Sequence, residues 1–384
     1  EAVNFLADDK LKGRGIGTQE IDMAANYIAN KFEEYGLKPG SDEGSFFQKW
    51  TQDVLDKKEI KLQNVIGLIP GKNTNLSEAV VISAHYDHLG TGWPNVKKGN
   101  NGKIHNGADD NASGVSVMLE LAKIFGELSK PSHTIIFVAF TAEESGLVGS
   151  RYFVNNYKKY SFSANLNIDT VGRLFDNKLM VLNSNSAAEW KYIFMGIKYS
   201  AGIETAIIPQ DLDASDQMAF IEKGIPGVQL FYSGIGSDYH VPEDDAHKID
   251  PAGLVKAATV SYEVLKYLAG REEPMAFKGT MKDGHSQSPS INKKSGERKA
   301  SPGIMPDFTF SGLGVKISGL SEDSPASKSG LLLNDIIIKF DGKTVNNLKE
   351  YSNLLKEHKP GDTVTFTIER EGKKEEINLT LSER

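Results

Sequence analysis

The chain has 384 residues, of which 39% are hydrophobic and 25% charged, and a formal net charge of −7; this is an ordinary soluble composition with room for two domains. It contains no apolar run of about 18 residues, so no membrane span is expected, and its acidic balance argues against a nucleic-acid partner. The absence of cysteine excludes thiol catalysis, disulfides and cysteine-based zinc sites, so a metal site would have to use His, Asp and Glu.

The first 270 residues alternate apolar runs with helical patterns. Apolar residues at helical spacing predict a helix over residues 18–37, closed by Gly36, and another over residues 251–270. Six short apolar runs predict buried strands: 62–69, 79–84, 134–141, 164–169, 178–182 and 226–232. Strands that alternate with helices indicate an α/β fold, a three-layer α/β/α sandwich with a mixed, mostly parallel sheet.

The composition changes after residue 270. Residues 271–302 are polar and rich in Ser, Lys and Gly without an apolar period, which is typical of a linker. Residues 303–384 return to strand-like patterning around one clear helix, NNLKEYSNLLKEH, and have the size of a small independent module. We therefore expect a domain over residues 1–270, a linker over 271–302 and a second domain over 303–384.

Acids and histidines follow four of the predicted strands. They are His85 and Asp87, Glu143 and Glu144, Asp169, and His240; the turn GADDNASG adds Asp109 and Asp110. Taken singly, each has an ordinary explanation as a surface pair, a solvated turn or a helix cap. Together they would collect at the carboxyl ends of one sheet, and burying so many acids is favourable only beside cations.

Two metal ions that share a carboxylate each need one further carboxylate and one histidine. That scheme is filled by His85, Asp109, Asp169, Glu144 and His240. Glu143 is not needed as a ligand in this scheme. It stands next to the predicted ligand Glu144, where a general base that activates water is expected. Asp87, two residues from His85, is placed to accept a hydrogen bond from the other N–H of the His85 imidazole. The other histidines are interpreted as non-ligands, with His88 and His105 nearest in sequence to the ligands.

The ordered motifs HYDH, GADDNASG, AEESG, NIDTVGR, SDQMAF and SDYHVPED resemble those of the M28 family of di-zinc peptidases, over roughly residues 10–270. The resemblance implies the zinc exopeptidase fold and two Zn²⁺ ions bridged by Asp109, with a cis bond between Asp109 and Asp110. It also implies Glu143 as acid and base, Tyr239 as a hydrogen-bond donor to the oxyanion, and peptide hydrolysis through a metal-bridged hydroxide.

The chain departs from the M28 pattern at two places that affect the expected substrate pocket. Gln217 stands where an SDH motif has its histidine, and residues 50–62 leave no room for a protease-associated insert. The similar M20 peptidases insert a domain between the fourth and fifth ligands, whereas here only 71 positions (240 − 169) separate Asp169 from His240.

Residues 303–384 resemble a PDZ domain of the bacterial protease-associated type, a small β-barrel-like unit, through the stretch SPASKSGLLLNDIIIKFDGK. A PDZ domain binds an extended peptide as an added strand and holds its terminal carboxylate on backbone N–H groups. This predicts a peptide-binding loop at Ser311, Gly312, Leu313, Gly314 and Val315. The alternative is a domain that only packs against the rest of the protein and whose peptide groove is blocked.

The expected function is that of a zinc aminopeptidase, which removes N-terminal residues from peptides with free N-termini. The alternatives are a carboxypeptidase that binds the substrate carboxylate through Arg173, a glutaminyl cyclase on the same fold, and a PDZ adaptor that binds C-terminal peptides. Asp211 and Asp213 hint at tolerance for basic side chains. A secreted or periplasmic bacterial location follows from the family resemblance and from Glu1 standing in place of a starting Met.

Overall fold

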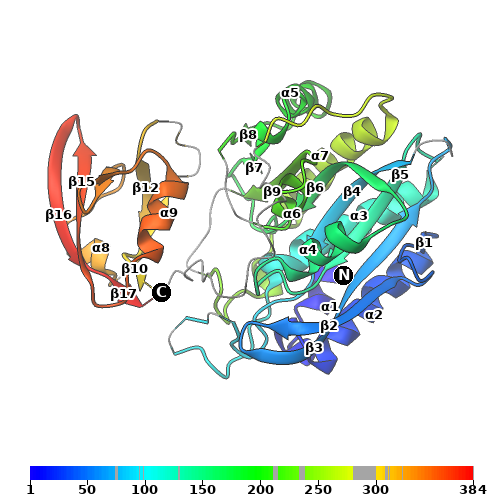
Figure 1. Ribbon diagram of the computed structural model, residues 1–384, viewed down its shortest axis with the longest axis horizontal. Coiled ribbons are helices and arrows are strands. Elements are labelled where there is room, and N and C mark those ends of the chain that lie inside the picture. Colours follow the sequence, from blue (N-terminus) through cyan, green and yellow to red (C-terminus); the bar gives the residue numbers. More distant parts are fainter. Residues whose placement is uncertain are drawn as a thin grey trace. The chain divides into compact units, whose positions relative to one another are not determined.

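The computed structural model describes residues 1–384 except 74–76, 95, 98, 129, 211–214, 233–237, 280–299, 308–309, 311, 322 and 384. The described residues form two compact units, one up to Gly279 and one from Ala300 onward (Figure 1). The division lies within the predicted linker, whose bounds of 271 and 302 remain a prediction. None of the described helices is long and apolar enough to cross a bilayer.

A mixed sheet of nine strands organises the first unit, in the order β1-β3-β5-β4-β6-β9-β7-β8, with β2 paired to β3. The strands are β1 (Lys38–Pro39), β2 (Phe47–Val54), β3 (Lys57–Ile69), β4 (Glu78–His85), β5 (Thr134–Phe140), β6 (Ser161–Ile168), β7 (Leu179–Leu182), β8 (Thr205–Ile207) and β9 (Gly227–Tyr232). All six predicted strands are confirmed. Parallel pairing joins β5, β4, β6 and β9 in the centre and β7 to β8, and the other pairs are antiparallel.

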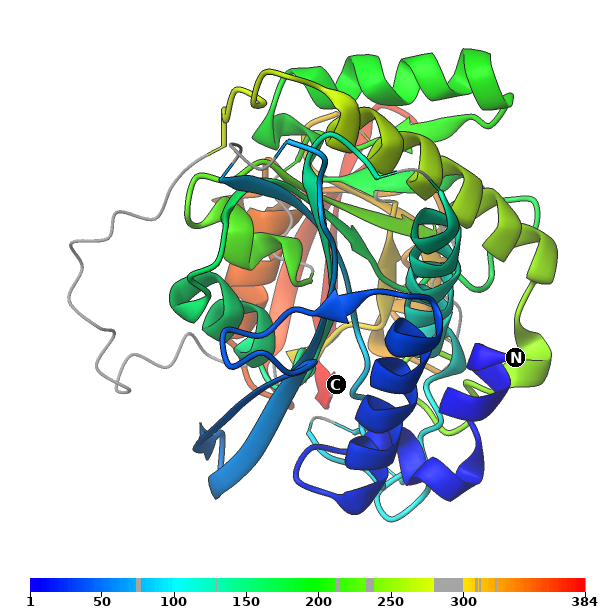
Figure 2. The ribbon, with the colours of Figure 1, turned by 90° about the vertical axis from the view of Figure 1, so that its right-hand side faces the viewer.

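Helices cover both faces of this sheet (Figure 2). One face carries α1 (Ala2–Leu6), α2 (Gln19–Glu34), α3 (Gly114–Glu127), α5 (Glu189–Ala201) and α7 (Pro251–Gly270), and the other carries α4 (Val148–Asn156) and α6 (Gln217–Ile221). Because side chains alternate along a strand, Val80 and Ile82 of β4 pack on the first face and Val81 on the second. The three-layer α/β/α sandwich is confirmed.

Short helical turns of the first unit lie between its longer elements. These are η1 (Asp9–Arg14), η2 (Ala108–Ser113), η3 (Ser184–Ser186) and η4 (Ala246–Lys248). The predicted helix over 18–37 is α2, which begins after Thr18, whose hydroxyl accepts a hydrogen bond from the Ile21 N–H at 3.3 Å. The predicted helix over 251–270 is α7, capped by Asp250 and started by Pro251.

The parallel register of the central strands sets where the candidate site forms. His85, the last residue of β4, pairs with Phe140 at the end of β5, and Asn167 near the end of β6 pairs with Ser83 of β4 and Gln229 of β9. The segments that follow β4, β5, β6 and β9 therefore leave the sheet at the same edge. This edge brings together residues that are far apart in the sequence.

The second unit contains an antiparallel sheet in the order β11-β12-β13-β15-β16, with β14 paired to β13, and a separate pair of β10 with β17. Its elements are β10 (Ala300–Ser301), β11 (Ile304–Pro306), β12 (Val315–Leu320), α8 (Pro325–Lys328), β13 (Ile336–Phe340), β14 (Lys343–Thr344), α9 (Leu348–Lys356), β15 (Thr363–Arg370), β16 (Lys373–Thr380) and β17 (Ser382–Glu383). The predicted helix is α9, and Tyr351 and Leu355 anchor it in a core of its own.

Candidate metal centre

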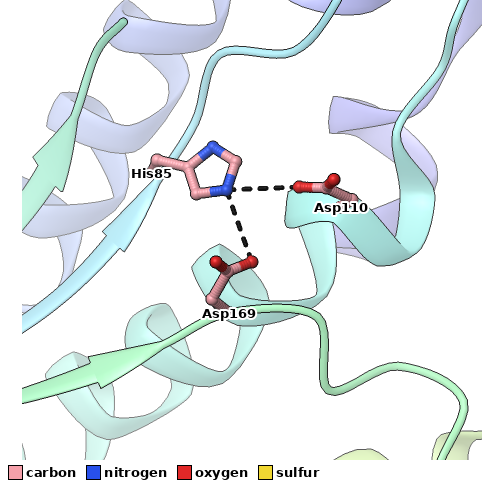
Figure 3. A group of neighbouring side chains, drawn as sticks. All are labelled: His85, Asp110 and Asp169. Carbon is pink, nitrogen blue, oxygen red and sulfur yellow. Dashed lines mark ion pairs between the residues drawn. The ribbon is translucent and has the colours of Figure 1, made fainter. Parts of the chain in front are cut away.

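His85 lies between two carboxylates at the carboxyl edge of the large sheet (Figure 3). Its Nε2 atom is 3.2 Å from Asp110 Oδ1 and 3.4 Å from Asp169 Oδ1. All three side chains are buried, and their ligand atoms lie close enough together to hold one metal ion. They come from the end of β4, from the turn η2 before α3, and from the end of β6.

His240 faces the opposite side of the same aspartate. Its Nε2 atom is 3.1 Å from Asp110 Oδ2 and 3.2 Å from Glu144 Oε2. Asp110 therefore presents one carboxylate oxygen to each histidine, and each histidine has a second carboxylate beside it. This is the donor arrangement that two neighbouring divalent cations with one shared carboxylate require.

The buried nitrogen atoms support the fit of a metal. His85 Nε2 and His240 Nε2 are buried and have no hydrogen-bond partner of good geometry among the described residues. Buried polar atoms are normally satisfied, so two unsatisfied imidazole nitrogens that face carboxylates are expected where a cation binds. Nitrogen and oxygen donors of this kind suit Zn²⁺.

The structure places Asp110, and not Asp109, between the two histidines. Asp109 turns away from the histidines: its Oδ1 accepts the Gly172 N–H at 2.7 Å, and its Oδ2 lies 3.8 Å from Arg173 Nε. Burial and the neighbouring Asp244 raise the pKa of Asp109 to about 8. Burial also favours the neutral form of Asp110, but the adjacent imidazoles of His240 and His85 hold its pKa well below the usual range.

The turn itself shows why Asp110 faces the histidines. The cis peptide bond joins Asp110 to Asn111, and not Asp109 to Asp110. Asn111 Oδ1 accepts the Gly114 N–H at 2.9 Å and the Thr170 N–H at 3.2 Å, while its amide donates to the Ile168 carbonyl at 3.0 Å. Asn111 therefore caps α3, whereas Asp110 faces the histidines.

Glu143 and Asp87 lie near His85, but Asp87 does not make the side-chain contact to His85 that the sequence predicted. Asp87 Oδ1 accepts the backbone N–H of Glu143 at 3.1 Å, whereas it is 3.6 Å from His85 Nδ1. The nearest acceptor to that imidazole nitrogen is the Asp87 carbonyl, at 3.2 Å. Burial raises the pKa of the Glu143 carboxyl well above its usual range, and the carboxylates of Glu144 and Asp216 add to this shift.

His88, interpreted from the sequence as a non-ligand, is in direct contact with the site. Its Nδ1 atom is 2.7 Å from Glu144 Oε1, and its ring meets the His240 ring edge-on with centroids 5.7 Å apart. Ligand atoms of His88, Asp110 and Glu144 also lie close enough together to hold an ion. The motif HYDH contained the signal, because its second histidine is on the same loop as His85.

Arg14 is a buried residue that sequence reasoning missed. Its guanidinium is fully buried and donates to the carbonyls of Tyr86 at 2.8 Å, Asn106 at 2.7 Å and Gly107 at 3.0 Å, and also to that of Leu6. It thereby joins the N-terminal segment to the loops that carry His85 and Asp110. No local pattern around Arg14 distinguishes it from an exposed arginine.

Tyr239 and Gln217 complete the surroundings. The Tyr239 ring stacks on the His240 ring with centroids 3.9 Å apart, and burial together with the nearby carboxylates of Asp110 and Glu144 raises its pKa well above the usual value. The amide of Gln217 donates to Gln229 Oε1 at 3.2 Å, and the amide of Gln229 donates to Asp169 Oδ2 at 3.2 Å. The residue that departs from the SDH motif is therefore linked to a predicted ligand.

In the second unit, the described part of the predicted peptide-binding loop is already used by the fold. Ser311 lies outside the described residues, and so do Asp211 and Asp213. The Gly314 N–H donates to the Asn346 carbonyl at 3.0 Å, Val315 pairs with Ile337 of β13, and Leu313 is exposed. β11 pairs with the second half of β12, at Ile317, Gly319 and Leu320. The peptide-binding role of residues 311–315 stays a prediction.

Comparisons with known proteins agree with this architecture. Aminopeptidase YwaD of Bacillus subtilis is 28% identical over 279 residues, which are 68% of this chain and 58% of YwaD, so the chain spans little more than half of that relative. The fold is that of BSAP, a zinc aminopeptidase from Bacillus subtilis (18% identity, TM-score 0.57, 72% of this chain and 96% of that one). It is also that of the glutaminyl cyclase of Porphyromonas gingivalis (20% identity, TM-score 0.59, 69% of this chain and 96% of that one).

Two family models match the sequence. The model of a PDZ domain matches residues 288–381, the region of the antiparallel sheet. The model of peptidase family M28 matches residues 64–265, more than half of the chain and the part that contains every residue of the candidate metal centre. The chain belongs to peptidase family M28.

Proposed function

We propose that the chain is a zinc-dependent aminopeptidase that hydrolyses N-terminal residues from peptides. The observation that carries the proposal is the position of Asp110, whose two carboxylate oxygens lie 3.2 Å from His85 Nε2 and 3.1 Å from His240 Nε2. One ion would be held by His85, Asp110 and Asp169, and the other by Asp110, Glu144 and His240. Divalent ions bound there would polarise the scissile carbonyl and activate water.

Glu143 is proposed as the residue that moves the proton. It takes a proton from the attacking water and gives one to the amine that leaves, which is the task of a general base that becomes a general acid. Its backbone N–H donates to Asp87 Oδ1, and burial raises the pKa of its carboxyl above the usual range, which favours a group that accepts and returns a proton. Its position next to Glu144 keeps it at the reacting centre without making it a ligand.

Tyr239 is proposed to stabilise the oxyanion that forms when water attacks the carbonyl. A phenol with a raised pKa stays protonated, so it can donate a hydrogen bond to developing negative charge. The stacked imidazole of His240 fixes the orientation of the Tyr239 ring. A preorganised donor of this kind contributes to catalysis because it need not reorient during the reaction.

The surroundings of Arg173 favour an aminopeptidase over a carboxypeptidase. Carboxypeptidase action requires a cation for the terminal carboxylate of the substrate, and Arg173 is the candidate from the sequence. Its guanidinium already lies 3.0 Å from Asp238 Oδ2 and contacts Asp244. A glutaminyl cyclase shares the fold, but the donor set for two ions is complete in this chain, which favours hydrolysis. Secretion or periplasmic location remains a prediction from the family resemblance.

The PDZ unit supplies a second candidate function, the binding of an extended peptide with a free C-terminus. We infer that the peptide adds either at the predicted loop of residues 311–315 or along β11, which, like β16, stands at one end of the strand order of its sheet among the described residues. In the second case the terminal carboxylate would lie at the segment that precedes β11, where Gly303 adopts a left-handed φ of 79°.

The shared ligand can be tested by metal content. We expect the wild-type chain to bind two zinc ions and the Asp110→Asn variant to lose both, because both ions depend on that carboxylate. The matched variant Asp109→Asn should keep two ions, since its side chain faces Gly172 and Arg173. Atomic absorption of dialysed protein gives the ratio. Loss of metal from Asp109→Asn with full retention by Asp110→Asn would contradict the assignment.

The reaction can be tested with a peptide mixture of which half is N-acetylated. Mass spectrometry should show stepwise shortening from unblocked N-termini only, and a zinc chelator should abolish it. Glu143→Gln should keep its metal and lose turnover by about 10²- to 10⁴-fold, the usual contribution of a general base. Trimming from C-termini would instead identify a carboxypeptidase, and a fully active Glu143→Gln would remove that residue from the mechanism.

Peptide binding by the PDZ unit can be located by hydrogen exchange of the full chain. If the peptide adds along β11, peptides with free C-termini should slow exchange in β11, and the same peptides as C-terminal amides should not. The variant Leu313→Asp should bind normally, because Leu313 is exposed at the loop that the fold already uses. Protection confined to residues 312–315, lost in Leu313→Asp, would instead place the peptide at the predicted loop.

A further inference from the structure

Arg173 contacts three carboxylates in the first unit. Its side chain places Nη1 3.0 Å from Asp238 Oδ2, Nη2 2.5 Å from Asp244 Oδ1 and Nε 3.8 Å from Asp109 Oδ2. Only 9% of Arg173 is exposed, and only 2% of Asp244. Charge pairs that are this shielded from water are much less screened than surface pairs, so their loss has a larger effect.

Asp244 connects this arginine to the turn that carries the shared ligand. Both of its carboxylate oxygens lie 3.0 Å from the backbone nitrogen of Asp109, and Oδ2 also accepts the backbone N–H of Asp110 at 3.1 Å. The Asp244 carbonyl accepts the Ala108 N–H at 3.0 Å. Three consecutive backbone N–H groups of the turn therefore donate to one residue.

The contacts of Arg173 and Asp244 join three loops that each carry a ligand. Arg173 lies on the loop after Asp169, the turn held by Asp244 contains Asp110, and Asp238 and Asp244 flank His240 in the sequence. Removal of the arginine would leave three acids close together without their shared cation, and they would repel one another. The turn would then move, and with it the carboxylate that faces both histidines.

We propose that Arg173 and Asp244 are positioning residues that hold the loops of Asp110, Asp169 and His240 in the geometry that binds two metal ions. The proposal rests on the metal centre of the proposed function and adds a role for two residues that contact neither His85 nor His240. Because Asp110 would bind both ions, weakening the contact between Asp244 and the turn should weaken the binding of both ions together.

The test is zinc affinity, measured by competition with a chromophoric chelator on folded protein. We expect Arg173→Gln and Asp244→Asn each to weaken binding of both ions by about 10- to 100-fold, the range for residues that orient metal ligands. The double variant should be less impaired than the product of the two single effects, because Asp244 without its arginine is itself unfavourable. Circular dichroism establishes that each variant is folded.

Arg370→Gln is the matched control. Arg370 also makes an ion pair with a buried carboxylate, its Nη2 lying 2.6 Å from Asp335 Oδ2, but Asp335 is in the second unit and on none of the ligand loops. This variant should bind zinc as the wild type does. If Arg173→Gln does not fold, Arg173→Lys takes its place. Lysine retains the positive charge but lacks the planar guanidinium that contacts two acids at once, so the binding of both zinc ions should still be weaker.

The outcomes separate this proposal from the function on which it rests. A wild-type chain that fails to bind two zinc ions would overturn the proposed metal centre itself. A wild-type chain with two ions, together with folded Arg173 and Asp244 variants of unchanged zinc affinity, would overturn only the positioning role. Weakening of one ion alone would also contradict it, because the turn would then not act through the shared Asp110.

Discussion

Carboxylates buried together at one edge of a sheet require positive charge beside them, and the candidate site depends on how that charge is supplied. The parallel register of β4, β5, β6 and β9 delivers Glu144, Asp169 and their neighbours to the same edge. Two histidines face these acids with nitrogen atoms that lack a hydrogen-bond partner of good geometry among the described residues. Such an arrangement is favourable when cations bind between the histidines and the acids, and it explains why ligands from distant segments occupy so small a space.

Two buried arginines hold the loops around this edge by different means. Arg14 donates to backbone carbonyls of the loops that carry His85 and Asp110, so it orders the chain without neutralising an acid. Arg173 pairs with Asp238 and Asp244 behind the turn, so it offsets negative charge where no metal ligand lies. The acids of the site thus divide into those that face the histidines and those that face Arg173, and Asp110 and Asp109 are adjacent residues on opposite sides of that division.

Much of this could be predicted from the sequence, because the predictive signals were local. Apolar periodicity gave the six strands and the main helices, and the residue types at strand ends gave four of the five residues that meet at the edge. The sequence alone could not decide between Asp109 and Asp110. Which of them faces the histidines depends on the conformation of the turn, which Asn111 fixes through hydrogen bonds to Thr170 and Ile168, and residue spacing does not reveal those bonds. His88 and Arg14 act through contacts far along the chain, and the position of β11 at the sheet edge depends on strand pairing. The GLGV loop indicated a PDZ domain, and the position of its groove stays a prediction.

The central claim is that one carboxylate, that of Asp110, is shared between two metal ions. Anomalous diffraction from crystals of the zinc-loaded chain, recorded on both sides of the zinc absorption edge, tests it directly. The account predicts two peaks about 3.5 to 4 Å apart, one beside His85 and one beside His240, with a different oxygen of Asp110 bound to each. A single peak, or two peaks with Asp109 between them, would contradict it.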